Sequence, residues 1–374
     1  MIAAPTLTLY VARRFLGATL TMLMALTLLV SMFDFIELLR RGATRPDATF
    51  ALVATIAALR MPFVATQIMP FAILLGGILA FWRLARSSEL IVARAAGISA
   101  WGFLSGPMLV AILFGTVAVA AVSPISSALL SRAERLDASF LRAGGGVTAL
   151  AGGRLWLRQA DRGLEPGGVA IVSGRPARLL ATDRAEFTLA EVSIWRLSAG
   201  DRVLARIEAP RARLQPGAWL LEDATAFLPG ERQGRPAEAL SLPTDLTPDR
   251  IEDSFASPDT LSFWALPGFI AVLEQAGFSA LRHRLQYQSM LSTPVLAMAM
   301  ALLAAGFSMR HSRRGGVGRM IGAGVAAGFA LFMLDRITGE FGESGALPVA
   351  IAAWVPAATG LLAALALLVY QEDG

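Results

Sequence analysis

Long apolar segments alternate with short polar breaks at both ends of the chain. Each segment has about 20 residues or more, the length with which an α-helix crosses the ~30 Å hydrocarbon core of a bilayer. The pattern therefore predicts six transmembrane helices, three on either side of a more polar middle section. The predicted spans are residues 15–33, 51–82, 100–123, 287–309, 320–338 and 347–370.

The middle section has a different pattern, in which apolar and polar side chains alternate over short stretches. Alternation with a period of two is typical of half-buried strands, and turn sequences such as QPGA and LPGERQG separate the stretches. The predicted fold class is a polytopic α-helical membrane protein with six transmembrane helices and an inserted antiparallel, jelly-roll-like β domain. The candidate strands are RLWLRQ, GVAIVSG, EVSIWRL, RVLARIEAPRARL and AWLLEDATAF.

Changes in composition set the predicted domain boundaries. The first three helices occupy residues 1–130, and the β domain occupies 131–258. A connecting helix and the last three spans occupy 259–374. The connecting helix reads LSFWALPGFIAVLEQAG, and Pro267 within it argues against a straight membrane span.

A short polar helix is predicted over residues 84–97, between the second and third spans. Ser87 and Ser88 suit a helix start, Glu89 then falls in the first turn, and Gly97 can end the helix. About three turns are too few to cross a bilayer. A capped helix held between two spans can pass a push from a soluble partner into the membrane, and an ordinary anchoring loop is the alternative.

The composition fits a membrane protein and excludes several chemistries. Of 374 residues, 55% are hydrophobic and 16% charged, and the absence of cysteine excludes disulfides and thiolate catalysis. Lysine is also absent, so all 33 basic residues are arginine. The net charge of +5 lies mostly in loops, which favours membrane orientation and anionic lipid contact over nucleic-acid binding.

Arginines in the short loops predict the orientation. Nine lie on the side of the termini and four on the far side, which places both termini in the cytoplasm and the β domain outside the inner membrane. The first span has no small-residue cleavage site, so it is predicted to be retained. The near-side set is Arg13, Arg14, Arg83, Arg86, Arg94, Arg310, Arg313, Arg314 and Arg319; the far-side set is Arg40, Arg41, Arg45 and Arg336.

Motifs for catalysis, metal binding and cofactor binding are missing from the sequence. A Walker A motif needs a lysine, and neither HExxH nor G-x-S-x-G occurs. His283 and His311 are predicted near opposite membrane faces, too far apart to share a metal. No catalytic residue, metal ligand or cofactor is therefore predicted, and a membrane enzyme is disfavoured.

Charged residues at the far ends of the spans are the remaining candidate sites. Arg40 and Arg41 either snorkel to the interface or grip a phosphate-bearing lipid headgroup. Glu37 stands four residues before Arg41 and competes for it, which would leave Arg40 the freer ligand. For Asp335 and Arg336 in the fifth span, an intramembrane ion pair is the preferred interpretation.

Taken in order, these segments resemble the lipopolysaccharide export permeases of the LptF/LptG family. Span one ending DFIELLRR, the stretch RSSELIVARAAGIS, the strands GRLWLRQ and IEAPRARLQPGAWLLEDATAF, and the final GALPVAIAAWVPA carry the resemblance almost end to end. The first and last spans are more similar to the LptG branch. No single segment is as specific as a metal motif, and the weight lies in their order.

The resemblance implies a permease subunit that extracts lipopolysaccharide from the inner membrane and passes it to a periplasmic bridge. Its implied partners are an LptB-like ATPase dimer, an LptF-like permease subunit and an LptC-like periplasmic protein. Glu89, Leu90 and Arg94 would contact the ATPase, and Arg40 and Arg41 would lie where lipid enters. Some members have a basic residue where Asp34 stands, so a headgroup contact there is not implied.

Two further questions follow from the implied role. The β domain is either an open trough for acyl chains, lined by inward positions such as Ile194 and Leu204, or a core filled only by its own side chains. A subunit that only relays ATPase motion, without carrying lipid, is the alternative function. Three spans on either side of the β domain favour the lipid carrier, because a relay needs fewer.

Overall fold

The computed structural model divides the chain into a helical unit and a β unit. The helical unit comprises 1–141, 258–267 and 281–374, and the β unit comprises 142–257 and 268–280. The first boundary falls after 141 and not after 130, because the third long helix continues past the end of its apolar stretch. The structure describes residues 5–43, 48–87, 89, 100–140, 148–151, 154–161, 168–178, 187–198, 200, 202–230, 233–244, 246–247, 251, 257–275, 278–308 and 317–372.

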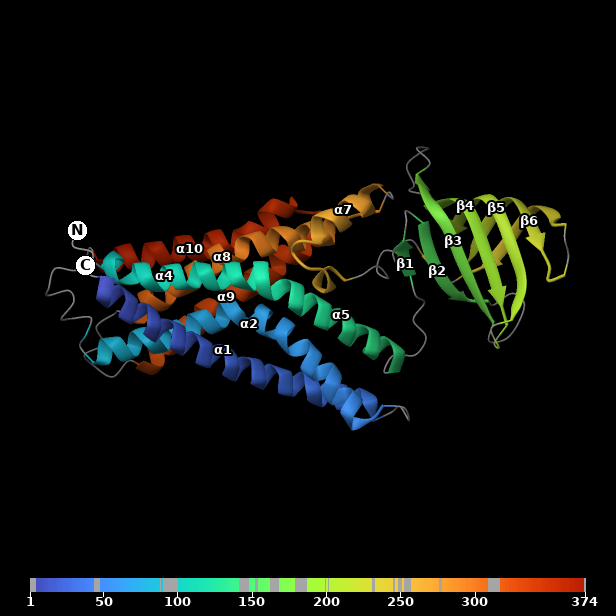
Figure 1. Cartoon of the computed structure of the whole chain (residues 1–374). Coiled ribbons are helices and arrows are strands. Elements are labelled where there is room, and N and C mark those ends of the chain that lie inside the picture. The colour runs from blue at the N-terminus through green and yellow to red at the C-terminus, as the bar shows by residue number, and fades with distance from the viewer. Residues whose placement is uncertain are drawn as a thin grey trace. The chain divides into compact units, whose positions relative to one another are not determined.

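The helical unit contains six helices that are long and apolar enough to cross a membrane, which confirms the predicted spans. Both chain termini lie at the same end of this unit (Figure 1). The third span is composite: two α-helices continue into one another through one turn of π-helix, η1. The elements are α1 (Pro5–Gly42), α2 (Phe50–Arg86), α4 (Ala100–Val117), η1 (Ala118–Val122), α5 (Ser123–Phe140), α8 (Leu281–Ser308), α9 (Val317–Glu343) and α10 (Val349–Glu372).

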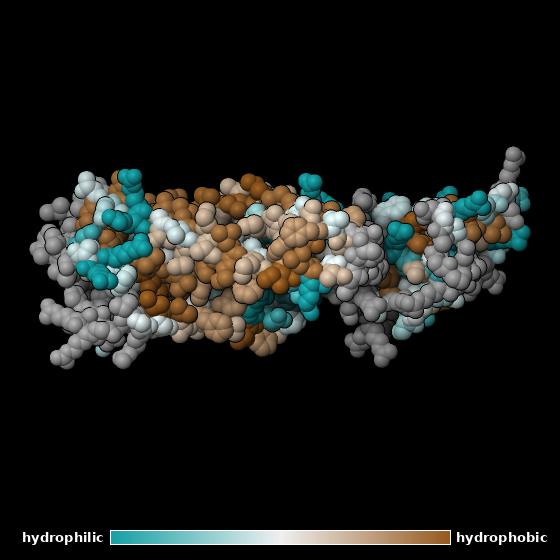
Figure 2. All heavy atoms as spheres, turned by 90° about the horizontal axis from the view of Figure 1, so that it is seen from below, coloured by the Kyte–Doolittle hydropathy of each residue, from teal (hydrophilic) through white to brown (hydrophobic). Residues whose placement is uncertain are grey.

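The surface of the helical unit is a broad apolar band with hydrophilic side chains towards either end (Figure 2). On α1, large exposed side chains such as Leu20, Met24 and Leu28 belong to this apolar surface. Water solvates such a surface poorly, whereas lipid tails or neighbouring membrane helices pack well against it. The band therefore fits the hydrocarbon region of a bilayer.

Helices α2 and α8 form the centre of the membrane part. Of the most apolar window of α8, 56% is buried, against 11% for α1. Close packing depends on small residues at the helix crossings. A Cβ added at Gly76 of α2 would lie 2.5 Å from the Cα of Thr19, and one at Gly115 of α4 would lie 2.6 Å from the Cα of Pro294. Alanine at either position would force two helix backbones apart.

The first three long helices extend well beyond the bilayer. Helix α1 has 38 residues, which span about 57 Å at 1.5 Å per residue. The extensions have a small core of their own, separate from the membrane core, formed at the far end by α1, α2 and α5. Its buried residues are Leu38, Val53, Ile56, Ala57 and Ala133. Hydropathy alone ended the first span at residue 33, because α1 becomes polar there although it remains helical.

The π-helix η1 marks the place where the third span changes character. Helix α4 before it is apolar, and α5 after it is amphipathic. The segment that returns from the β unit docks here: the Trp264 indole donates to the Ala120 carbonyl at 3.0 Å, and the Phe263 amide donates to Ser123 Oγ at 3.0 Å. A π-helix displaces backbone carbonyls from the regular ladder, so an outside donor can reach one.

The β unit contains one antiparallel sheet of seven strands, paired strictly in chain order. The predicted inserted β domain is confirmed, but its described strands form a meander, without the Greek-key crossovers of a jelly roll. Five strands match the predicted stretches; β1 and β7 were not predicted, because neither alternates clearly. The strands are β1 (Thr148–Ala151), β2 (Arg154–Ala160), β3 (Val169–Arg178), β4 (Phe187–Leu197), β5 (Val203–Gln215), β6 (Ala218–Phe227) and β7 (Arg235–Pro243).

One face of the sheet forms the apolar interior of the β unit. Ile194 is fully buried in it, as predicted. The prediction for Leu204 was wrong: the buried positions of β5 are Ala205, Ile207 and Ala209, so Leu204 lies on the outer face with Arg206. Alternation over the whole strand gives the observed parity, because Arg206 and Glu208 share the face of Leu204; the apolar character of Leu204 alone was misleading.

The connection back to the membrane is shorter and more broken than predicted. A single helical segment was expected over 259–277, whereas the structure has the 3-10 turn η2 (Pro258–Thr260) and then α7 (Leu266–Gln275). Pro267 is the second residue of α7, where its missing N–H is tolerated. It begins the helix and does not kink it.

A buried glutamine holds distant strands of the sheet together. Gln159 of β2 accepts hydrogen bonds from Trp219 Nε1 at 3.3 Å and from Thr244 Oγ1 at 2.7 Å, and its own amide donates to the Pro243 carbonyl at 3.1 Å. A side chain of β2 is therefore joined to the edge strand β7, although the two are not ladder neighbours. The sheet must coil strongly to bring them together.

Replacing Gln159 with leucine should loosen the β unit. The change leaves the buried Trp219 indole and Thr244 hydroxyl without their acceptor, at a cost of about 1–3 kcal/mol for each group. Amide hydrogen exchange in β6 and β7 of the full chain should accelerate. Arg158→Leu, a change to the exposed neighbour on the same strand, is the control and should leave exchange nearly unaltered; equal exchange in both variants would contradict the role of Gln159.

Candidate functional site

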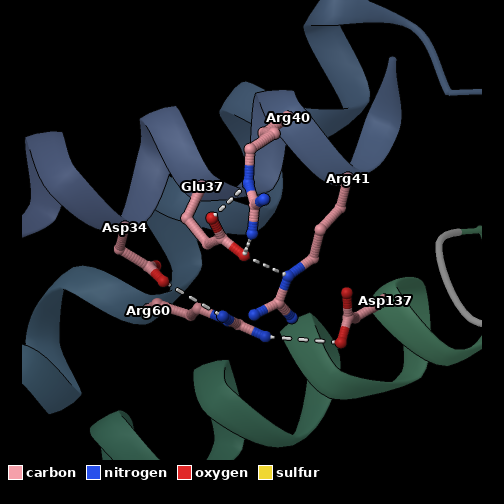
Figure 3. A network of polar contacts seen from close by, with 6 residues as sticks. All are labelled: Asp34, Glu37, Arg40, Arg41, Arg60 and Asp137. Carbon is pink, nitrogen blue, oxygen red and sulfur yellow. Dashed lines mark hydrogen bonds and ion pairs between the residues drawn. The ribbon is translucent and has the colours of Figure 1, made fainter. Parts of the chain in front are cut away.

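Six charged residues form a network where α1, α2 and α5 meet at the far end of the helical unit (Figure 3). Three are carboxylates and three are guanidinium groups, so the network is balanced in formal charge. Two sets of contacts make it up, one around Glu37 on the outside and one around Arg60 on the inside. The members are Asp34, Glu37, Arg40, Arg41, Arg60 and Asp137.

Glu37 binds both candidate headgroup ligands. Arg40 donates to its two carboxylate oxygens at 2.8 and 2.9 Å, and Arg41 Nε donates to Oε1 at 2.9 Å. The predicted pair of Glu37 with Arg41 is present, but Arg40 is not the freer ligand, since it makes the bidentate contact. Spacings of three and four residues put both arginines on the Glu37 face of α1.

Both arginines nevertheless remain accessible to an outside anion. The side chain of Arg40 is 78% exposed and that of Arg41 is 50% exposed. Exposed ion pairs of this kind contribute about 0–1 kcal/mol, so an incoming phosphate can replace Glu37 at small cost. A phosphate offers guanidinium the same bidentate geometry as a carboxylate and carries more charge. The exposure of both guanidinium groups is therefore compatible with headgroup binding by Arg40 and Arg41, which stays a prediction.

Arg60 is the inner centre of the network. Its guanidinium lies 3.3 Å from Asp34 Oδ1 on α1 and 3.5 Å from Asp137 Oδ2 on α5. The Asp137 side chain is 1% exposed, so its charge is almost fully removed from water. Arg60 Nε is also buried and has no hydrogen-bond partner among the described residues. One cation thus ties three helices together at the level where they leave the membrane.

Neither Arg60 nor Asp137 was singled out from the sequence, although a signal was available. Arg60 interrupts the apolar run ALVATIAALRMPF, and a charge within a predicted span is costly unless it is paired. Its partners could not be found in the same way, because Asp34 and Asp137 are far from it in sequence. Asp34, left without a role in the sequence analysis, has one here as an ion-pair partner.

The ion pair predicted between Asp335 and Arg336 is not formed within the described residues. Adjacent residues diverge by about 100° around a helix, and the Arg336 guanidinium instead lies over the Phe332 ring, 5.7 Å from its centroid. Arg336 also acts on Asp259 in η2, which accepts a hydrogen bond from Gln286 at 3.1 Å. Burial and the nearby Glu343 raise the pKa of Asp259, and Arg336 opposes the rise.

The predicted polar helix over 84–97 falls mostly outside the described residues, as do Leu90 and Arg94. Its first residues belong to α2, which ends at Arg86. Ser87 is the C-cap of α2, and its hydroxyl donates to Glu89 Oε1 at 2.9 Å. Glu89 is helical and half-buried. Its contact with an ATPase stays a prediction.

A family model described as "Lipopolysaccharide export system permease LptF/LptG" matches residues 9–370. The chain belongs to the LptF/LptG family. The match covers both helical parts and the inserted β unit, so the resemblance seen in the sequence is confirmed over nearly its whole length. The chain is thus a multi-pass membrane permease of a lipopolysaccharide export system.

Individual LptF/LptG relatives agree with this assignment. The chain is 27% identical to the "Lipopolysaccharide export system permease protein LptG" of Escherichia coli (strain K12), over 96% of this chain and 98% of the relative. It is 24% identical to the LptG protein of Haemophilus influenzae, over 94% of each. Both carry the LptG name, in line with the expectation from the first and last spans.

Removing one partner of Arg60 should destabilise the far end of this permease. Asp137→Ala leaves Arg60 with a single carboxylate in a largely buried place and should lower the free energy of unfolding by about 1–3 kcal/mol. Asp34→Ala should cost less, because the Asp34 side chain is 29% exposed. Arg60→Met combined with Asp137→Leu should recover most of the loss, since the one carboxylate that then loses its partner, Asp34, is 29% exposed and can be hydrated. Thermal unfolding in detergent measures all three, and a double variant no better than Asp137→Ala would show that the charge pairing is not the cause.

Proposed function

We propose that this chain is the permease subunit of an ABC-type exporter that extracts lipopolysaccharide from the inner membrane and passes it to a periplasmic bridge. The observation that carries the proposal is the family match over residues 9–370, which spans the six membrane helices and the β unit together. The exposed arginines at the far end support it, because a lipid with phosphates needs cationic ligands at headgroup depth. The permease itself has no ATPase motif, so a partner must supply the energy.

The proposed orientation follows the arginine asymmetry of the short loops. Both termini lie in the cytoplasm, and the β unit lies in the periplasm. In this orientation Glu89, Leu90 and Arg94 are cytoplasmic and contact an LptB-like ATPase dimer. An LptF-like subunit completes the permease, and an LptC-like protein accepts lipid from the β unit.

Arg40 and Arg41 are the proposed ligands of the lipid phosphates. Glu37 is their internal substitute for phosphate, because it satisfies both guanidinium groups when no lipid is bound. Lipid binding then replaces one carboxylate with one phosphate. The network around Arg60 stays in place during this exchange, since its carboxylates come from Asp34 and Asp137.

Replacing the two arginines and replacing Glu37 should have opposite effects on the amount of bound lipopolysaccharide. Arg40→Ala combined with Arg41→Ala should lower lipopolysaccharide co-purified with the complex at least about tenfold, through loss of two charge-assisted contacts. Glu37→Gln should raise it, because the competing charge is removed. Lipid per protein is measured in detergent and in nanodiscs. Normal loading by the alanine pair would show that the arginines only snorkel.

The coupling role of Glu89 is tested by charge reversal. Glu89→Arg should lower the amount of ATPase that co-purifies by about fivefold or more, since a docking carboxylate becomes a repelling cation. Membrane insertion should be normal, and Glu340→Arg at the other end of the helical unit is the matched control. Unchanged ATPase recovery together with unchanged export would remove Glu89 from the interface.

A relay that transmits ATPase motion without carrying lipid is the second candidate function. The long extensions of α1, α2 and α5 favour it to some degree, because rigid helices transmit motion well. Lipid release from reconstituted complexes, assayed with and without ATP, separates the two functions. Release that depends on ATP but takes place without any lipid contact to this subunit would support the relay.

A further inference from the structure

The inward face of β4 is apolar along most of its length and closed differently at its two ends. Phe187 and Leu189 lie at its start, and Ile194 lies near its end, all in the same buried cluster. Arg196 follows on the same face, two residues after Ile194. One end of this face is therefore apolar and the other is charged. This difference in polarity affects where an apolar ligand can enter.

A buried ion pair closes the end at Arg196. Its guanidinium makes a bidentate contact with Asp161, at 2.7 Å from Nε to Oδ2 and 2.6 Å from Nη2 to Oδ1. The Asp161 side chain is fully buried and that of Arg196 is 12% exposed. Opening this end would separate two largely desolvated charges, and an acyl chain could satisfy neither of them.

An apolar plug closes the end at Phe187. The plug consists of Phe269, Ile270, Leu273, Phe278 and Ala280, from α7 and the residues that follow it. The Phe278 ring lies 5.5 Å from the Phe187 ring, which in turn lies 5.9 Å from the Trp219 ring. Leu273 is 1% exposed and Phe278 is 5% exposed, so the plug is a full part of the core.

The plug does not belong to the sheet in sequence. It follows η2 and stands immediately before Leu281, the first residue of the membrane helix α8. Its residues belong to the apolar cluster on the inward face of the sheet, although they lie outside the seven described strands. The chain continues directly from Ala280 into α8, a membrane span.

We propose that the Phe187 end is the entrance through which lipid acyl chains reach the interior of the β unit, and that the plug occupies it until lipid arrives. The inference rests on the proposed function, in which the β unit carries lipid. Plug side chains and acyl chains are both hydrocarbon and need the same surface, so they exclude one another. Hydrophobic burial has no preferred direction, and one can replace the other without leaving a polar group unpaired. Movement of the first turn of α8 would draw the plug out.

The absence of cysteine makes the test direct. Phe187→Cys combined with Phe278→Cys is bridged with a short bifunctional methanethiosulfonate reagent that a reductant releases. The control pair is Leu220→Cys with Ser241→Cys, cross-strand neighbours on the outer face of the sheet. Each pair also carries a photoreactive residue at position 194, and the chain is assembled with its ATPase and second permease subunit.

The bridge between positions 187 and 278 should lower photocrosslinking of lipopolysaccharide at position 194 at least fivefold, and reductant should restore it. Lipid bound by the helical unit and ATPase activity should persist, and the control bridge should change nothing. Phe278→Ala alone should raise crosslinking at position 194. This variant contains no bridge, so its effect cannot come from a cross-link that distorts the sheet.

Two outcomes would overturn the inference in distinguishable ways. Equal crosslinking with and without the 187–278 bridge would mean that the plug does not control access, while lipid passage through the β unit would stand. No lipid crosslink at position 194 in any variant, including the chain without cysteines, would contradict lipid passage through the β unit and the plug with it.

Discussion

A charge in an apolar helix needs a partner, and the far end of the helical unit is built on that requirement. Arg60 stands in α2 among apolar residues, and its guanidinium reaches carboxylates on both neighbouring helices. Because Asp137 is almost completely buried, the three helices cannot separate there without exposing an unpaired charge to a poor solvent. The small core around Leu38 and Ile56 packs beside this contact and depends on the same alignment.

The β unit follows a different physical rule, since its stability comes from covering one apolar face. The sheet coils so that its two sides meet at a buried glutamine, an ion pair holds one end of its inward face, and a segment from outside the strands completes the apolar cluster. Polar contacts at Gln159 and Asp161 fix the geometry, whereas the contact at Phe278 is only hydrophobic. An interior closed partly by directional bonds and partly by hydrocarbon contacts can hold its shape while its apolar part rearranges.

Periodicity was enough to predict the fold class, and it failed where distant residues decide. Six spans and five strands were found because hydropathy and alternation are local properties. The inward position of Leu204 was wrong, because its apolar side chain was weighed alone and not with Arg206 and Glu208, which share its face of β5. The meander order differs from the expected jelly-roll-like order, because the sequence of a single strand does not determine which strands it pairs with.

In the candidate site, too, contacts between residues close in sequence could be predicted, and contacts between distant residues could not. Arg40, Arg41 and Glu37 are within one helical turn, so their association was predictable, although which arginine binds Glu37 twice was not. Arg60 was visible as an anomaly, but its pairing with Asp34 and Asp137 needed three helices in place. Asp335 and Arg336 looked like a pair because they are adjacent, yet adjacency on a helix points side chains apart.

The π-helix in the third span can absorb the loss of one residue. A π-turn contains one residue more than an α-turn needs, so losing one alanine from η1 would let α4 and α5 join as a regular helix. The extra residue is taken up by the wider turn, so α5 would keep nearly the same facing relative to α4, and Asp137 would still face Arg60. The Ala120 carbonyl, however, would return to the regular helical ladder and would no longer be offered to Trp264. A one-residue deletion in this hydrophobic stretch would thus preserve the ion pair and remove the docking contact of the returning segment.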